Sequence, residues 1–280
     1  MTLLSWLRTD LRAELAVQAR RPVHGLLVGV AVTLTLVFGY VVPYAGYAAG
    51  TTGPPGSDRG LAAMLPAAFL GSATAGTPVF AGALALVLGA LVVGSEEGWQ
   101  TWKTLLLQGT GRVRVYAAKV AVAALGAGAL TAASLLAAAA ASATVAAAED
   151  AAATWPAAAD VVTGLASAWL ITGTWAVVGV VLAVLLRSVA LPVGLGLVWV
   201  LAVQNLLTAL AAPLLTEVAE AQRWLPGPNA GSLVHWLGAP ASTPGVQDLV
   251  GPGHAVAVLG CYLVTLALLG GWVFWRRDVR

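Results

Sequence analysis

Residues 78–94 read PVFAGALALVLGALVVG, a run of seventeen residues without a charged side chain. A helix rises about 1.5 Å per residue and the hydrocarbon core of a bilayer is about 30 Å thick, so a crossing helix needs roughly 20 apolar residues. The run does not alternate between apolar and polar positions, as a barrel strand would. Because the backbone must satisfy its own hydrogen bonds in lipid, we expect this run to form a transmembrane helix.

The composition of the whole chain extends this expectation. Of the 280 residues, 59% are hydrophobic and only 9% are charged, and the mean hydropathy is +0.88. A soluble domain carries about 25% charged residues, which excludes an ordinary water-facing surface here. We predict an all-α membrane protein whose domain at residues 22–280 has six transmembrane helices, at about residues 23–42, 78–94, 115–144, 161–186, 191–214 and 255–275.

The distribution of Lys and Arg predicts the orientation. Twelve of the fourteen basic residues lie in the N-terminal segment, the second-to-third connection, the fourth-to-fifth turn or the C-terminal tail, and only Arg59 and Arg223 lie in the other connections. Cytoplasmic loops of membrane proteins carry the excess of basic residues. We therefore expect both termini and the segment 95–114 to be cytoplasmic, and residues 215–253 to form an external loop containing short helices.

Residues 1–21 precede the first apolar run. Leu4, Leu7, Leu11 and Leu15 recur at helical spacing, with charged residues between them. This pattern is typical of a helix that lies in the membrane interface, and the alternative interpretation is a solvated helix before the first span. The expected fold is therefore a six-helix bundle with an N-terminal interfacial helix.

Residues 95–119 form a polar segment between two apolar runs and read SEEGWQTWKTLLLQGTGRVRVYAAK. Ser95 is a favourable N-cap, and acidic residues at 96 and 97 would suit the first turn of a helix. One helical face would carry Trp99, Trp102, Leu105 and Leu106, and the opposite face Glu97, Thr101, Thr104 and Gln108. We expect Lys119 to reach back to the lipid headgroups. The helix could lie in the interface or dock into a groove on a cytoplasmic partner.

The same segment resembles the first cytoplasmic loop of type-2 ABC exporter permeases. The resemblance rests on the acidic start, Thr101, the run Lys103-Thr104-Leu105-Leu106, Gly109, Arg112 and Lys119, placed between a second and a third span. The six-span layout, residues 224–233 and the ending WRRDV at 275–279 are also similar to bacterial members. The Trp-rich start departs from many members, which have more basic residues there.

The resemblance implies a role for the segment. In that family the loop is a coupling helix that fits a cleft on a separate ATP-binding subunit. The residues that would dock here are Glu96, Glu97, Trp99, Trp102, Lys103, Leu105 and Leu106. The chain would then be the permease subunit of an exporter in the bacterial inner membrane, working with two ATP-binding subunits and a second permease chain, identical or homologous, among membrane lipids and without nucleic acid.

The sequence has no G-x-x-x-x-G-K-[ST] phosphate-binding loop. We therefore expect no catalytic residues, metal or cofactor in this chain, with ATP and Mg²⁺ held by the partner subunit. An intramembrane enzyme similar to the CAAX-processing proteases is the alternative function. It would pair the adjacent glutamates with histidines on neighbouring spans. His24 is expected at the cytoplasmic end of the first span and His235 and His254 on the other side of the bilayer from Glu96, so these groups cannot form one site.

The expected spans carry no acidic or basic residue near mid-membrane, which disfavours a transporter driven by protons or sodium. Their most polar central residues are Gln204 and Asn205, followed by Thr172 and its neighbour Trp175. These side chains could form hydrogen bonds between helices, the interpretation we favour, or line a substrate path. A path without fixed charge would suit an apolar or amphipathic substrate such as a drug, a lipid-like molecule or a peptide.

Overall fold

The computed structural model describes residues 3–50, 60–98, 111–211 and 214–276. These residues form helices and no strands, which confirms the all-α class. Six helical stretches are long and apolar enough to cross a membrane, as expected of a multi-pass membrane protein. They cover Pro22–Ala49, Pro66–Glu96, Arg112–Ala148, Ala158–Leu186, Ala190–Ala209 and Pro252–Arg276.

Helix α1 (Leu3–Ala19) precedes the first span, which consists of α2 (Pro22–Leu36), the π-helical turn η1 (Val37–Val41) and α3 (Val42–Ala49). The helix continues well beyond the predicted end at residue 42. Pro43 lacks the N–H that an α-helix needs, and the π turn lies directly before it. Local π adjustments of this kind let a membrane helix accommodate proline.

The second stretch also begins earlier than predicted. Two 3₁₀ turns, η2 (Leu61–Met64) and η3 (Pro66–Ala68), lead into α4 (Phe69–Thr74), a second π turn η4 (Thr77–Ala81) and α5 (Gly82–Gly98). Pro78 was expected at the start of the span, but it lies within η4. The segment before Pro78, which lies outside the predicted span of residues 78–94, packs as helix against α7 and α8.

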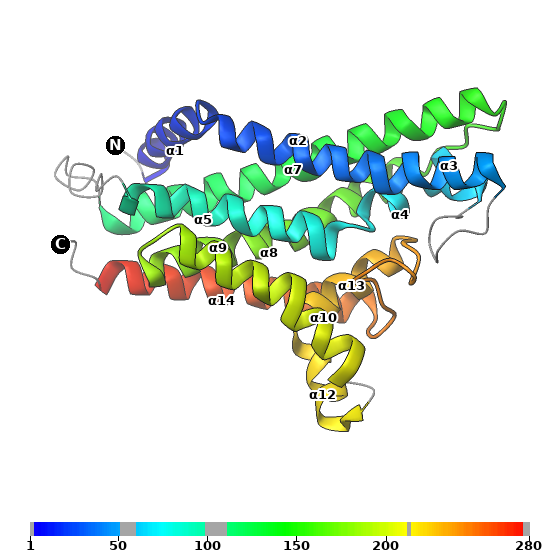
Figure 1. Ribbon diagram of the computed structural model, residues 1–280. Coiled ribbons are helices and arrows are strands. Elements are labelled where there is room, and N and C mark those ends of the chain that lie inside the picture. Colours follow the sequence, from blue (N-terminus) through cyan, green and yellow to red (C-terminus); the bar gives the residue numbers. More distant parts are fainter. Residues whose placement is uncertain (1–2, 51–59, 99–110, 212–213, 277–280) are drawn as a thin grey trace.

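The third and fourth spans are α7 (Arg112–Ala148) and α8 (Ala158–Leu186). Arg187 adopts a left-handed conformation and ends α8, and α9 (Ala190–Leu197) follows at once, which confirms the predicted tight turn. The fifth stretch continues through η5 (Val198–Val203), α10 (Gln204–Leu206) and η6 (Leu207–Ala211) and leans away from the bundle in Figure 1.

The predicted external loop does contain short helices. They are α12 (Thr216–Ala221), η7 (Gln222–Trp224) and α13 (Pro226–Trp236), and the last span, α14 (Pro252–Arg276), follows them. Half-exposed tryptophans lie at both ends of the molecule, among them Trp272 and Trp275 at the end of α14 and Trp155 and Trp224 at the other end. Tryptophans at two such levels are typical of the two interfaces of a membrane.

Helices α5 and α8 form the centre of the bundle. Two thirds of the residues in the most apolar parts of the second and fourth spans are buried, against about a fifth in the first, fifth and sixth. The two helices approach closely because Gly89 faces the backbone of Ala176 and Gly179 faces that of Leu86. A Cβ at Gly89 would lie 1.9 Å from the Ala176 carbonyl oxygen, so only glycine fits there.

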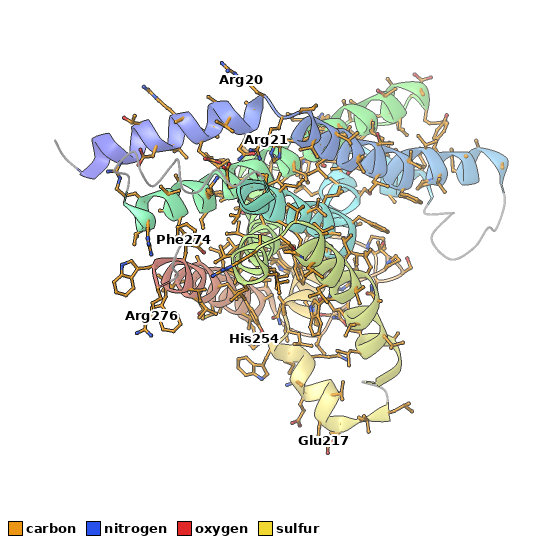
Figure 2. The ribbon with its side chains drawn as sticks, turned by 60° about the vertical axis from the view of Figure 1, so that its left-hand side comes forward. Arg20, Arg21, Glu217, His254, Phe274 and Arg276 are labelled. Carbon is orange, nitrogen blue, oxygen red and sulfur yellow. The ribbon has the colours of Figure 1, made fainter. Side chains whose placement is uncertain are left out.

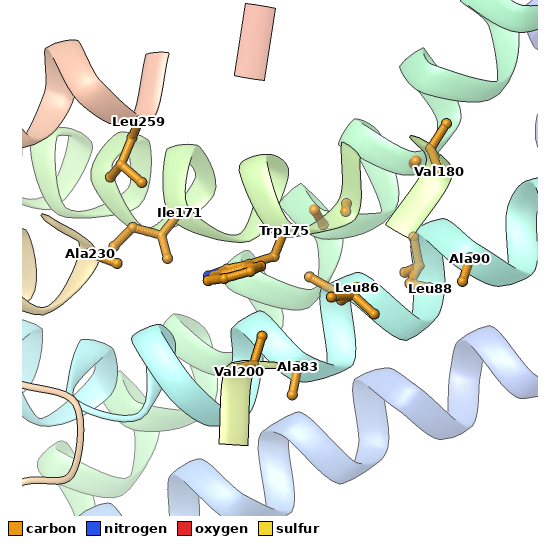
Figure 3. Close-up of a cluster of buried hydrophobic side chains, with 14 of the residues drawn as sticks. Ala83, Leu86, Leu88, Ala90, Ile171, Trp175, Val180, Val200, Ala230 and Leu259 are labelled. Carbon is orange, nitrogen blue, oxygen red and sulfur yellow. The ribbon is translucent and has the colours of Figure 1, made fainter. Parts of the chain in front are cut away.

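The core between these helices is centred on Trp175 of α8 (Figure 3). Its ring is 1% exposed and fills the space opposite Gly82, where a Cβ would lie 2.6 Å from the ring. Ile171 of the same helix lies beside it, and side chains from four further elements complete the cluster; those labelled in Figure 3 include Leu86 of α5, Val200 of η5, Ala230 of α13 and Leu259 of α14. The outer faces of the bundle expose many large apolar side chains, which suits contact with lipid or with a partner helix.

The charged residues separate between the two ends of the bundle. Helix α1, the end of α5, the start of α7 and the end of α14 lie together at one end, which we call the α1 end (Figure 1). The α8–α9 turn is also there, since the Ser188 carbonyl oxygen lies near Gly94 of α5. Every described Arg and Lys except Arg223 is on these elements or in the turn after α1, whereas Glu149, Asp150, Asp160, Glu217, Glu220 and Asp248 lie away from the α1 end.

Candidate functional site

The α1 end contains a cluster of ionised side chains from three helices and the turn after α1. We call it the charge cluster; it consists of Asp10 and Glu14 of α1, Arg21, Glu96 of α5, and Arg114 and Lys119 of α7. Its three acidic and three basic residues balance in charge. Neutral partners at its edge are Gln18, His24 and Ser95.

Lys119 lies at the centre of the charge cluster. Its Nζ is 2.9 Å from Glu14 Oε1, 3.4 Å from Glu96 Oε1 and 3.2 Å from the Val92 carbonyl oxygen. Only 1% of the side chain is exposed, so the prediction that Lys119 reaches the headgroups is wrong. Burying an ammonium is strongly unfavourable unless it is paired, and the two carboxylates supply that pairing.

Glu96 receives a second cation from the turn between α1 and α2. Arg21 Nη2 lies 3.4 Å from Glu96 Oε1, and Arg21 Nη1 donates a hydrogen bond to the Ser95 hydroxyl. Ser95 in turn donates to the Leu91 carbonyl oxygen at 2.7 Å. Ser95 therefore lies within the last turns of α5 and not at the N-cap of a separate helix, so that prediction is wrong.

A second ion pair ties α1 to the first turn of α7. Arg114 contacts Asp10 Oδ2 through two nitrogens, Nε at 3.1 Å and Nη2 at 2.5 Å. Nearby, Arg112 Nη1 donates to the Trp275 carbonyl oxygen at the end of α14, at 3.3 Å. The polypeptide on both sides of residues 99–110 is thus bonded to helices from the start and the end of the chain.

Helix α1 turns its polar side toward the bundle. Asp10, Glu14 and Gln18 are spaced four residues apart and face α5 and α7, and Gln18 is 5% exposed. Leu15 and Val17, in contrast, are 36% and 46% exposed. The exposed residues of α1 also include Arg12, so apolar and charged side chains both face outward, which is compatible with a helix at the membrane interface.

The structure locates only part of the predicted docking surface. The side chains of Glu97, Trp99, Trp102, Lys103, Leu105 and Leu106 lie outside the described residues. Glu96 is described, and its side chain is 7% exposed because it points into the charge cluster. The sequence analysis did not predict the charge cluster. The pattern that could have predicted it is the four-residue spacing of Asp10, Glu14 and Gln18, which puts these polar side chains on one face of α1, where Asp10 and Glu14 pair with Arg114 and Lys119.

The four residues proposed for a substrate path do not form one site. Trp175 belongs to the core, and Gln204 is 3% exposed and packs on Gly227 of α13. Asn205 donates to the Leu201 carbonyl oxygen of its own helix at 3.0 Å. Of the four, only Thr172 borders a partly open cavity of about 370 Å³, between α2, the α4–α5 segment and α7.

The three histidines are not near one another. His24 Nε2 contacts Gln18 Oε1 at 2.8 Å at the α1 end, whereas His235 and His254 contact the carbonyl oxygens of Ala239 and Arg223 at the other (Figure 2 labels Arg21 and His254). Within residues whose side chains are described, no group of three or more His, Cys, Asp and Glu is placed to hold a metal ion.

No protein-family model and no curated protein sequence matches this chain. The similarity of residues 95–119 to the cytoplasmic loop of exporter permeases therefore stays a prediction from the sequence.

Proposed function

We propose that this chain is the permease subunit of an ABC exporter in the bacterial cell membrane. The observation that carries the proposal is the charge cluster, which joins α1, the end of α5 and the start of α7, the elements on either side of residues 99–110. A loop that transmits force from a cytoplasmic partner needs a rigid base of this kind. Ordinary connecting loops have no such requirement.

The contacts of the cluster would distribute a push on residues 97–111 over several helices. Helices α5 and α7 continue directly from the segment. Lys119 and Arg114 connect α7 to α1, and Arg112 connects it to the end of α14. Buried, mutually satisfied ion pairs resist separation because each partner would be left charged and unpaired. The helices around the loop would therefore move as a unit.

In this proposal the chain itself binds no nucleotide. ATP and Mg²⁺ are held by two copies of a separate ATP-binding subunit, which dock on the cytoplasmic coupling helix, and a second permease chain completes the transporter. Both termini and the α1 end face the cytoplasm. The excess of basic residues at that end supports this orientation.

The interior supports an apolar or amphipathic substrate. The cavity beside Thr172 is lined by small, apolar and hydroxyl side chains, and none of its lining residues is charged. Moving an ion through such an environment is costly, whereas a neutral molecule loses little on entering it.

The test is co-expression of the chain with an ATP-binding protein encoded beside its gene. Trp102→Asp and Leu106→Asp would place charge on the apolar face of the expected coupling helix, and we expect both to lose the ATP-binding subunit on purification. Thr104→Asp on the opposite face is the matched control and should retain it. If both apolar-face variants keep a stoichiometric ATPase whose hydrolysis the chain still stimulates, the docking proposal is wrong.

A further inference from the structure

The cavity beside Thr172 is partly open to the outer face of the bundle and borders four of the membrane spans. Its walls come from residues 31–42 of the first span, residues 72–84 of the second and residues 130–135 of the third, with Thr172 of α8 and residues 242–244 completing it. Its volume of about 370 Å³ is within the range of small-molecule pockets. It lies within a single copy of the chain, so it requires neither an ATP-binding subunit nor a second permease.

Both π-helical turns on this side of the bundle contribute to the cavity. Turn η1 supplies Phe38 and turn η4 supplies Phe80, and their rings stack at 6.2 Å with an angle of 3° between the planes. Phe38 is 55% exposed and Phe80 is 38% exposed, which places the pair at the rim. Single π turns inside α-helices are frequent at functional sites.

The polar groups of the cavity are hydroxyls, and one of them has no partner. Thr131 and Thr172 contact each other through their hydroxyl oxygens at 3.0 Å. Ser134, one turn further along α7, is 6% exposed, and its Oγ makes no hydrogen bond to any described residue. A serine in a helix can readily bond the carbonyl four residues back, as Thr131 does with Ala127. Ser134 instead has a free donor and acceptor in an apolar cavity, an unfavourable arrangement unless a ligand completes it.

We propose that this cavity binds an uncharged, largely apolar molecule that dissolves in the bilayer and hydrogen-bonds to Ser134 Oγ through a single hydroxyl or carbonyl group. The absence of charge among the lining residues disfavours an ionised ligand. A plain hydrocarbon would leave Ser134 unpaired. The half-exposed Phe38–Phe80 pair is the point of entry, because it borders both the cavity and the outer face of the bundle.

The experiment uses the full chain in lipid nanodiscs and a long-chain fatty alcohol that carries a photoreactive diazirine. We expect saturable labelling that maps to residues around Leu84, Leu130 and Leu135, which border the cavity. Unlabelled fatty alcohol should compete, the corresponding ionised fatty acid should not, and the alkane of equal length should compete more weakly. Labelling that does not saturate, or that maps only to outer faces of the bundle, would overturn the proposal and leave water as the partner of Ser134.

Two pairs of variants distinguish the contribution of the Ser134 hydrogen bond to binding from the contribution of the cavity volume. Ser134→Ala should weaken labelling roughly five- to tenfold, the effect of losing one hydrogen bond. Ser142→Ala, the same change further along α7 and away from the cavity, should have no effect. Ala81→Leu, which puts bulk into the cavity, should abolish labelling, whereas Ala143→Leu on the exposed side of α7 should not. Unchanged labelling in Ala81→Leu would contradict the site, and unchanged affinity in Ser134→Ala would contradict the role of the hydroxyl.

The proposed ligand could be either a neutral lipid of the membrane or an apolar solute dissolved in it, because both have the required chemistry. Mass spectrometry of solvent extracts from the purified protein distinguishes them. A neutral single-chain lipid retained by the wild type and lost in Ala81→Leu identifies a resident lipid. Extracts without one, together with saturable labelling, identify a site for solutes. Both results support the cavity as a binding site, and neither depends on the proposed exporter function.

Discussion

Lys119 Nζ lies between two carboxylates that come from different helices, 2.9 Å from Glu14 of α1 and 3.4 Å from Glu96 of α5. The ammonium is almost fully buried, and the carboxylates are 12% and 7% exposed. One cation therefore joins the N-terminal helix to the end of the second span. It does so directly beside the segment that we propose as the coupling element.

Removing this cation should loosen the α1 end. Lys119→Met keeps most of the side-chain volume but leaves Glu14 and Glu96 buried with less positive charge. Breaking a buried ion pair from one side costs roughly 3–5 kcal/mol. We expect a corresponding fall in the thermal unfolding temperature of the protein in detergent, together with faster proteolysis at α1.

The control is the double variant Lys119→Met with Glu96→Gln. Because it removes a charge of each sign, it should recover part of the stability that Lys119→Met loses, and the double-mutant cycle gives the coupling between the two side chains. Additive losses would mean that Lys119 and Glu96 are independent in the folded protein.

The close approach of α5 and α8 predicts a strong effect of a small change. In Gly89→Ala the new methyl group would meet the Ala176 carbonyl oxygen, which is backbone and cannot rotate away. Overpacking of this kind costs about 1–3 kcal/mol. Gly260→Ala on α14 has no neighbour within 4 Å and should leave stability unchanged or raise it by up to about 1 kcal/mol. Thermal unfolding measures both, and equal effects would contradict the packing.

Much of this fold could be predicted from the sequence, because apolar runs of membrane length have few alternatives to helix. The six runs and the Arg187 turn were found in this way. The ends of the helices could not be predicted in this way. Because proline lacks the backbone N–H of a helix interior, Pro43 and Pro78 both indicate a helix boundary in the sequence. Only the three-dimensional structure shows the π turns that accommodate them.

The orientation of the bundle gives a further prediction, which single cysteines can test after Cys261 is replaced by alanine. Arg20, Arg276 and Glu217 are exposed, the first two at the α1 end and the last at the tip of the arm, ending in α12, that leans away from the bundle (Figure 2). A membrane-impermeant maleimide should label Glu217→Cys on intact cells. It should label Arg20→Cys and Arg276→Cys only after the membrane is permeabilised. Labelling in the reverse pattern would invert the orientation and remove the coupling segment from the cytoplasm.

The candidate sites were less predictable than the fold. Counting basic residues assigns Arg114 and Lys119 to the cytoplasmic side, but in the structure they form ion pairs with Asp10 and Glu14, about a hundred residues earlier in the chain. Contacts between residues so far apart in the chain are hard to predict from one sequence. The cavity is also invisible at that level, because it needs two π turns and a packing geometry among four helices.

The last prediction concerns Gln204, whose amide is buried. Substituting it distinguishes a structural role of this side chain from a role in transport. Its Oε1 has no hydrogen-bond partner among the described residues, and the amide packs against Gly227. A buried polar atom without a hydrogen-bond partner adds nothing to the stability of the folded protein. Replacing the side chain with an apolar one of similar shape should therefore hardly change the free energy of unfolding. We expect Gln204→Met to change the free energy of unfolding by less than about 1 kcal/mol and to leave transport unchanged.

Asn229 is the matched comparison, because its Nδ2 donates to the carbonyl oxygens of Arg223 and Leu225, both at 2.8 Å. Asn229→Leu removes both side-chain hydrogen bonds, but the Arg223 carbonyl oxygen keeps its contact with His254 Nε2 at 2.9 Å and the Leu225 carbonyl oxygen still accepts from the Asn229 backbone N–H at 3.3 Å. The substitution should therefore cost about 1–2 kcal/mol, the loss of two hydrogen bonds without an orphaned carbonyl. Unfolding in detergent measures both variants. A large loss of transport in Gln204→Met without a loss of stability would return Gln204 to the substrate path, since a side chain with only a packing role cannot produce that combination.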